Sequence, residues 1–297
     1  MGGVVPITTV VTSVLDCRDK VLRSLGRLPP FSPVLNRVLA SISGEDFSFS
    51  AVADLIEKDT VLAGNVLKIV NSALYGRRGT VNSVRHAVSL LGINKLRNAV
   101  LSLSIARMWN SVKTPPGWSM ARFNLHSVAV GILCDQIAQY NDVEYPEGAF
   151  VAGLLHDVGH LLIAVAAPSE YIALEKLYAL GGRTWCECEM EILGFTHADI
   201  SAEALDSWNL PEPIRHAVEG HHSFETGAGR ANNGEIPLSA LLCAADEYVR
   251  FCGTAIHPNY SASDEPSPAR FLDMAGDRVD AVVNAWKAEV AAVNSYF

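Results

Sequence analysis

Apolar residues recur every three or four positions along most of the chain, the spacing that gathers them on one face of an α-helix. No run of alternating Val, Ile or Thr leads into an Asn-Gly or Asp-Gly turn, so no β-sheet is expected. Glycines and prolines divide the pattern into segments of helical length. The sequence therefore predicts an all-α fold, with helices over residues 10–25, 33–42, 50–57, 59–74, 84–91, 93–109, 118–140, 147–166, 169–180, 184–194, 197–208, 211–222, 238–252 and 269–294.

The strongest interruption of the helical pattern is Lys113-Thr-Pro-Pro-Gly117. It predicts a boundary between two helical lobes, residues 1–115 and 116–297. Charge changes sign nearby, because residues 1–122 carry 15 Lys and Arg against 7 Asp and Glu, whereas the rest carry 8 against 25. The basic lobe suits an acidic partner, nucleic acid or the acidic half of its own chain. Polar stretches over 223–237 and 254–268 are expected to be loops.

Composition narrows the class of protein. The 297 residues are 49% hydrophobic and 19% charged, which excludes a disordered chain, and the six scattered cysteines predict reduced thiols. The most apolar run, residues 151–168, holds His156, Asp157 and His160 and is a poor membrane span. The N-terminus lacks the features of a secretory signal, so we expect a cytoplasmic protein without a membrane partner. The single Cys-x-Cys at Cys186 has no second pair to complete a metal site.

Histidines and acids in apolar surroundings supply the candidate chemistry. Asp157 and Asp246 both follow apolar runs, and burying an unpaired carboxylate is costly, so a compensating cation is predicted. Several imidazoles with two carboxylates are typical of a transition-metal site. The remaining histidines, His86, His216 and His257, are interpreted as ordinary surface or core residues. The candidate site residues are His126, His156, Asp157, His160, His197, His221, His222 and Asp246.

Two sets of motifs carry a family resemblance. Phe150-Val-Ala-Gly-Leu-Leu-His-Asp-Val-Gly159, with the upstream His126, resembles the HD-domain superfamily of metal-dependent phosphohydrolases. Leu28-Pro29-Pro30, Asp59-Thr-Val-Leu62 and Asn71-Ser72-Ala-Leu-Tyr-Gly76 resemble the HDOD family of bacterial signalling proteins. The resemblance covers roughly residues 15–252. It implies an all-helical HDOD lobe packed on an HD-type metal-binding lobe, and a role in signal transduction.

The resemblance also implies a ligand set. The superfamily ligands correspond to His126, His156, Asp157 and Asp246, and the related HD-GYP phosphodiesterases add the equivalents of His197, His221 and His222. Asp157 would then bridge two ions, with His126, His156 and Asp246 on one and the three added histidines on the other. The cofactors implied are two transition-metal ions, Fe or Mn first, with Zn, Ni or Co as alternatives.

Departures from the HD-GYP pattern bear on activity. Those enzymes carry Lys three residues after the motif Asp, where this chain has His160, a candidate proton donor, extra ligand or simply packed residue. The Gly-Tyr-Pro signature is absent after His222, and Arg230 is a candidate phosphate contact. We therefore expect a non-catalytic signalling module whose two metals stabilise a surface for a signalling partner. The alternative is a phosphohydrolase or phosphodiesterase acting on a nucleotide-like phosphoester, with Asp157 and His160 as catalytic residues.

Overall fold

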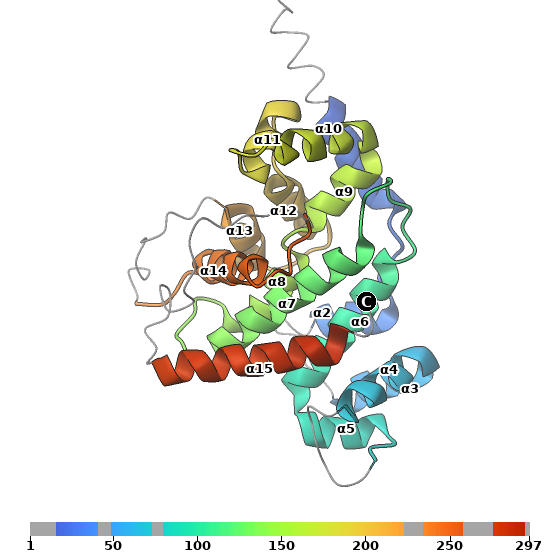
Figure 1. Ribbon diagram of the computed structural model, residues 1–297. Coiled ribbons are helices and arrows are strands. Elements are labelled where there is room, and N and C mark those ends of the chain that lie inside the picture. The colour runs from blue at the N-terminus through green and yellow to red at the C-terminus, as the bar shows by residue number, and fades with distance from the viewer. Residues whose placement is uncertain (1–15, 41–48, 73–79, 223–233, 258–275, 295–297) are drawn as a thin grey trace, which may run out of the picture.

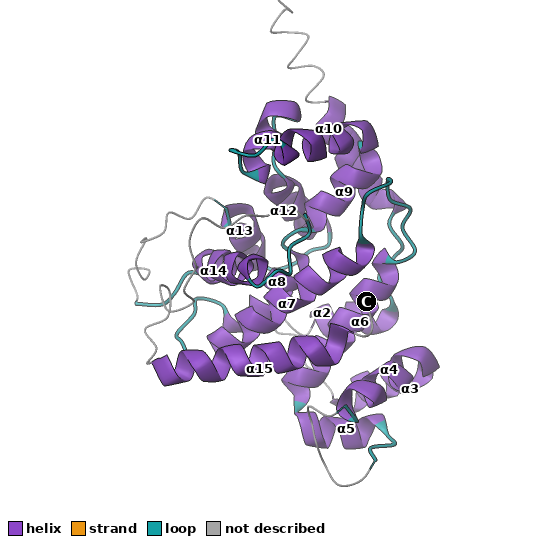
Figure 2. Cartoon of the chain, in the orientation of Figure 1, coloured by secondary structure: helices purple, strands orange, loops and turns teal. Residues whose placement is uncertain are grey.

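The protein is helical, as the sequence predicts (Figures 1 and 2). A computed structural model describes residues 16–40, 49–72, 80–222, 234–257 and 276–294. Within these ranges there is no β-sheet, and one isolated bridge joins Val143 and Ile236. A first helix covers residues 16–23. The following elements are η1 (Ser24–Arg27), α2 (Pro33–Ala40), α3 (Phe49–Lys58), α4 (Thr60–Val70), α5 (Val84–Leu91), α6 (Ile93–Trp109), α7 (Met120–Ala138), η4 (Pro146–Gly148), α8 (Ala149–Leu155), α9 (Val158–Ala166), α10 (Pro168–Ala179), α11 (Trp185–Ile192), α12 (His197–Ser207), α13 (Glu212–Gly220), α14 (Leu238–Phe251) and α15 (Gly276–Asn294).

The predicted helix over 147–166 is wrong in one respect, because it is two helices. α8 ends at Leu155, and α9 begins at Val158. Asp157 between them has φ −101° and ψ 12°, outside the helical region. Other predictions fall outside the described residues, namely helix positions 10–15, 41–42, 73–74 and 269–275, most of the loops over 223–237 and 254–268, and Arg230.

Motif residues of the N-terminal half hold helix ends and turns. The Asp59 carboxylate caps α4 by accepting hydrogen bonds from the backbone N–H groups of Val61 and Leu62, at 3.2 and 3.0 Å. The Asn71 side chain both donates to and accepts from the backbone of Val81, each at 2.8 Å, and so fixes the chain that enters α5. These polar motif residues therefore stabilise helix ends and turns of the N-terminal half, in which α2 to α6 pack against one another.

The C-terminal half is built around α7, which packs against α8, α14 and α15 (Figure 1). Where α7 crosses α8, two glycines meet, and a Cβ on Gly153 would lie 2.6 Å from the Cα of Gly131. Only glycine permits this approach, which brings His126 on α7 close to His156 at the end of α8. Trp286 of α15 donates from Nε1 to the carbonyl of Ala129 at 2.8 Å and fixes α15 on α7.

The two halves share a continuous hydrophobic core. Trp208, the residue after α12, packs against Trp109 of α6 and against Phe31, with ring centroids 6.2 and 5.0 Å apart. Ion pairs join Arg18 to Glu203 and Lys95 to Glu289, so some basic residues of the N-terminal half pair with acidic residues of the C-terminal half.

One helical stretch among the described residues, Pro146–Ala166, passes a length and composition test for a membrane span. Its apolar window is 94% buried inside the protein, and it carries the His156-Asp157 motif at its centre. This is the behaviour of a core helix pair.

Candidate metal centre

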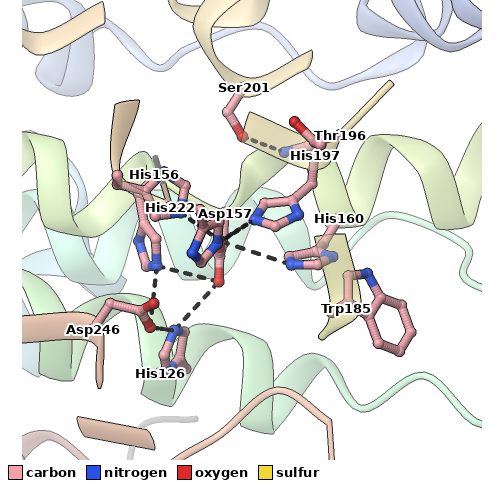
Figure 3. Close-up of polar contacts among 12 residues, drawn as sticks. His126, His156, Asp157, His160, Trp185, Thr196, His197, Ser201, His222 and Asp246 are labelled. Atoms are coloured by element: carbon pink, nitrogen blue, oxygen red, sulfur yellow. Dashed lines mark hydrogen bonds and ion pairs between the residues drawn. The ribbon is translucent and has the colours of Figure 1, made fainter. Parts of the chain in front are cut away.

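The seven ligands expected from the sequence lie in one buried cluster around Asp157 (Figure 3). They come from α7, the break between α8 and α9, the start of α12, the end of α13 and the middle of α14. Six have side chains almost completely enclosed, and His222 is partly exposed. The fold therefore brings together residues far apart in the sequence: His126 and Asp246, 120 positions apart, contact each other.

Two of the histidines stand at helix C-termini. His156 is the C-cap of α8, and His221 is the C-cap of α13. Each ring donates from Nδ1 to a carbonyl of its own last turn, to Gly153 at 2.8 Å and to Val218 at 2.5 Å. A carbonyl oxygen only accepts, so Nδ1 carries a proton and Nε2 is the nitrogen that faces the cluster. The sequence therefore positions these rings through the ends of their helices.

His197 is held by a carboxylate that sequence reasoning missed. It is the first residue of α12, and Thr196 and Asp199 form a capping box at the N-terminus of this helix. Glu189 of α11, fully buried, accepts from both Nδ1 and the backbone N–H of His197, at 2.7 and 2.9 Å. Its other oxygen accepts from Trp185 Nε1 at 2.8 Å. Such a carboxylate fixes the tautomer of a ligating histidine and raises its basicity.

The break at Asp157 coincides with a close approach of α9 to α12. A Cβ on Gly159 would lie 2.0 Å from the carbonyl oxygen of His197, so α9 starts in direct contact with the start of α12. The Gly159 backbone N–H donates to the Ser201 hydroxyl at 2.8 Å, which replaces a bond that a continuous helix would make. The chain leaves α8, turns at Asp157 and docks on α12, so this carboxylate projects into the cluster.

The two oxygens of Asp157 face different groups of nitrogens. Oδ2 lies 3.3 Å from His126 Nε2 and 3.2 Å from His156 Nε2. Oδ1 of Asp246 is 3.2 and 3.8 Å from the same two nitrogens. We call His126, His156, Asp246 and Asp157 Oδ2 the carboxylate-rich group.

The second group is built mainly from imidazoles. Asp157 Oδ1 lies 3.3 Å from His197 Nε2 and 3.7 Å from His221 Nε2. His222 Nε2 is 2.9 Å from His197 Nε2. The four ligand atoms lie within 4.8 Å of one another. We call His197, His221, His222 and Asp157 Oδ1 the imidazole-rich group.

Unpartnered atoms test whether metal fits this arrangement. Among the described residues, four buried atoms of the cluster have no hydrogen-bond partner: His156 Nε2, His221 Nε2, Asp157 Oδ1 and Asp246 Oδ1. Leaving a buried polar atom unpaired costs about 1–3 kcal/mol. All four belong to predicted ligands, two in each group, and imidazole nitrogen with carboxylate oxygen is a donor set for first-row transition metals. The residues of the cluster therefore fit the binding of transition metal. The metal-binding combinations found in the described residues contain no cysteine.

The pKa values of the clustered histidines are shifted in different directions. Burial lowers the pKa of His126 and His156, but Asp157 and Asp246 outweigh it and raise both, to about 10 for His156. In His221 and His222 burial wins, and the pKa falls. Burial raises the pKa of Asp157, but neighbouring histidines, His156 first, hold it well below its usual range.

His160 lies beside the imidazole-rich group. Its ring stacks on His197 with centroids 3.7 Å apart, and its Nε2 is 3.8 Å from Asp157 Oδ1. Burial and then the charge of His197 hold the pKa of His160 well below its usual range. A neutral imidazole has a lone pair to give, so this environment favours the predicted ligand role over a standing proton donor.

Three further residues border the cluster that sequence analysis did not assign to it. The carbonyl of Thr254 accepts from His126 Nδ1 at 2.7 Å. Arg250 Nη2 lies 2.9 Å from Asp246 Oδ2. His257, interpreted from sequence as incidental, stacks on Trp185 at 3.4 Å and lies 5.1 Å from the ring of His160. His86 and His216 are exposed.

Sequence comparison identifies relatives of the chain. A family model described as the HDOD domain matches residues 28–224, more than half of the chain, and Asp246 lies beyond the matched range. An uncharacterized protein of Treponema pallidum is 25% identical over 246 residues, which are 82% of this chain and 45% of that protein. The chain therefore spans less than half the length of this curated relative.

Solved structures share the fold. An HDOD protein of unknown function from Geobacter sulfurreducens has a TM-score of 0.76 at 24% identity, covering 97% of this chain and 99% of that one. A Shewanella amazonensis protein provisionally assigned as a phosphohydrolase has a TM-score of 0.69 at 22% identity, covering 93% and 97%. A Marinobacter aquaeolei protein provisionally assigned to signal transduction has a TM-score of 0.69 at 21% identity, covering 95% and 66%. At these identities the likeness concerns the fold.

Proposed function

The chain belongs to the HDOD family, and from that membership and the geometry of the cluster we propose that it binds two transition-metal ions and hydrolyses a nucleotide-like phosphoester. The observation that carries the proposal is the division of the ligand atoms by Asp157, whose two oxygens face separate sets of nitrogens. Each set offers one ion four protein ligands. For a six-coordinate ion such as Fe or Mn, that leaves positions for water and substrate.

The chain's own residues prepare the site for this chemistry. Two metal ions held by these ligands would supply an activated water and polarise a phosphoryl oxygen. Asp157 holds the two groups together, and Glu189 fixes the ring of His197. His160, beside the imidazole-rich group, is proposed to add a ligand or accept a proton. Fe or Mn is the first choice of metal, with Zn, Ni or Co as alternatives.

A second candidate is the non-catalytic signalling module that the sequence favours. Deep burial supports it, because the side chains of His156 and His221 are 0% exposed and that of His126 only 1%. Ions held so deeply would stabilise the fold and a surface for a signalling protein, without reaching substrate. The provisional assignment of the Marinobacter relative to signal transduction points the same way.

Turnover by metal-loaded protein separates the two candidates. For the enzyme, we expect cleavage of an activated phosphodiester that disappears with a chelator and in His126→Ala. The exposed His86 provides the control, and His86→Ala should behave as wild type. Full occupancy by two ions with no turnover of cyclic dinucleotides or other phosphoesters would contradict hydrolysis and favour the signalling module.

A further inference from the structure

Arg250 is attached to the candidate centre through Asp246. It lies one helical turn after Asp246 in α14, and its Nη2 is 2.9 Å from Asp246 Oδ2. The other oxygen of that carboxylate, Oδ1, faces the ring of His126 at 3.2 Å. One carboxylate thus joins the guanidinium to the carboxylate-rich group.

Arg250 also extends from the buried cluster toward solvent. Its side chain is 24% exposed, against 3% for Asp246 and 1% for His126. The guanidinium therefore contacts a buried carboxylate of the cluster and is itself accessible to solvent.

The charge of a loaded centre favours an anion. Two divalent ions bring four positive charges, and Arg250 brings one. The three buried carboxylates Asp157, Asp246 and Glu189 bring three negative charges. With neutral imidazoles as ligands, the net charge of the site is two positive, and it would be one positive without Arg250. Fixed positive charge in a low-dielectric site attracts anions strongly.

We propose that Arg250 binds the anionic group of the ligand at the metal centre, a phosphate or phosphoester, while it aligns Asp246. A guanidinium carries five donors in a planar fork and can contact a carboxylate and a phosphate at once. Arg250 thereby provides the permanent cation that the sequence lacks at position 160. This inference rests on the proposed function, because the anion must also contact the metals.

Inorganic phosphate is the probe that tests this role. Its dissociation constant is measured by titration calorimetry on metal-loaded protein, with metal content determined in each sample. We expect Arg250→Gln to keep two metal equivalents and weaken phosphate binding about tenfold or more, the value of a charged hydrogen bond. Arg250→Lys should fall in between. The matched control is Arg215→Gln, because Arg215 is 30% exposed and pairs with Asp206 at the surface.

Unchanged phosphate affinity in Arg250→Gln at full metal content would overturn the proposal. Loss of metal in both Arg250→Gln and Arg250→Lys would also overturn it, since Arg250 would then serve only to hold Asp246. If only Arg250→Gln loses metal, weaker phosphate binding by Arg250→Lys supports the proposal and unchanged binding overturns it. Wild-type protein that holds two ions and binds no phosphate refutes the role of Arg250 and leaves the metal centre standing. Wild-type protein that binds no metal refutes the proposed function itself.

Discussion

The two halves of the centre are made of different ligands and supported differently. The carboxylate-rich group combines two carboxylates with two imidazoles, and His126 and Asp246 lie inside long helices. The imidazole-rich group has one shared carboxylate and three imidazoles at or beyond helix ends, and His222 is partly exposed. If an ion binds to each group as proposed, two carboxylates would place more negative charge near the ion of the carboxylate-rich group, which favours harder metals there. We therefore expect the two positions to bind metal with unequal affinity and to be separable by mutation.

The largest effect should come from the residue that the halves share. Asp157→Ala removes a ligand from each ion, so both metal equivalents should be lost. Saturating metal adds about 2.7 kcal/mol per ion at one hundred times its dissociation constant, so the thermal midpoint should also fall. Elemental analysis and thermal unfolding check this, with His86→Ala as the control. Equal metal content in Asp157→Ala and wild type would refute the assignment.

A substitution in only one of the two ligand groups should remove one ion and leave the other bound. Asp246→Asn is expected to lose the ion of the carboxylate-rich group, and His222→Ala the ion of the imidazole-rich group. Each variant should retain one metal equivalent, measured after loading and desalting. Loss of both ions in both variants would contradict separable halves and indicate a single cooperative unit.

A smaller effect is expected from the support of His197. Glu189→Gln keeps the size of the side chain but removes the charge that fixes Nδ1 of His197. Affinity for one ion should fall about 10- to 100-fold, while the other is unaffected. Competition with a chelating dye measures both affinities. Glu187→Gln is the matched control on the same helix, because Glu187 is exposed and caps α11 through Thr184. Equal loss in the two variants would contradict a specific role.

The pH dependence of the metal-free protein sharpens the contrast. Where a carboxylate raises the folded pKa of a histidine, the stability gained is full below the unfolded value of about 6.5 and is lost as pH rises through the folded value. The pKa values of His126 and His156 are raised in this way, that of His156 to about 10, and Glu189 raises the pKa of His197 in the imidazole-rich group as well. Metal-free protein should therefore lose a few degrees in thermal midpoint between pH 6.5 and 10. Metal-loaded protein should not, because the ion replaces those protons. The same change of thermal midpoint with pH in metal-free and metal-loaded protein would refute this prediction.

Most of the fold follows from the sequence, because helix formation depends on local spacing and breakers, whereas the full set of candidate ligands came from the resemblance to the HD superfamily. Helical spacing and breakers gave nearly every helix, and apolar flanks around Asp157 marked a carboxylate that needs a cation. The helix break did not follow. It depends on the contact of Gly159 with the His197 carbonyl, which only the packing of α9 on α12 creates.

The residues that border and support the candidate ligands could not be identified from their local sequence. Glu189 is the middle one of three glutamates that alternate with Cys and Met over 187–191, and only the docking of α11 decides that Glu189 is the buried one. Arg250, four residues after Asp246, has the spacing of an ordinary helix-surface ion pair. His257 is a lone histidine whose stacking on Trp185 joins segments 72 residues apart. Tertiary contact, and no local signal, selects these residues.

Anomalous diffraction from crystals of metal-loaded protein would locate the ions directly. We expect two separate peaks, one next to each oxygen of Asp157 and about 3.5–4 Å apart. One peak should be surrounded by His126, His156 and Asp246, the other by His197, His221 and His222. A single peak, or peaks that leave Asp157 uncoordinated, would contradict a dinuclear centre bridged by this residue.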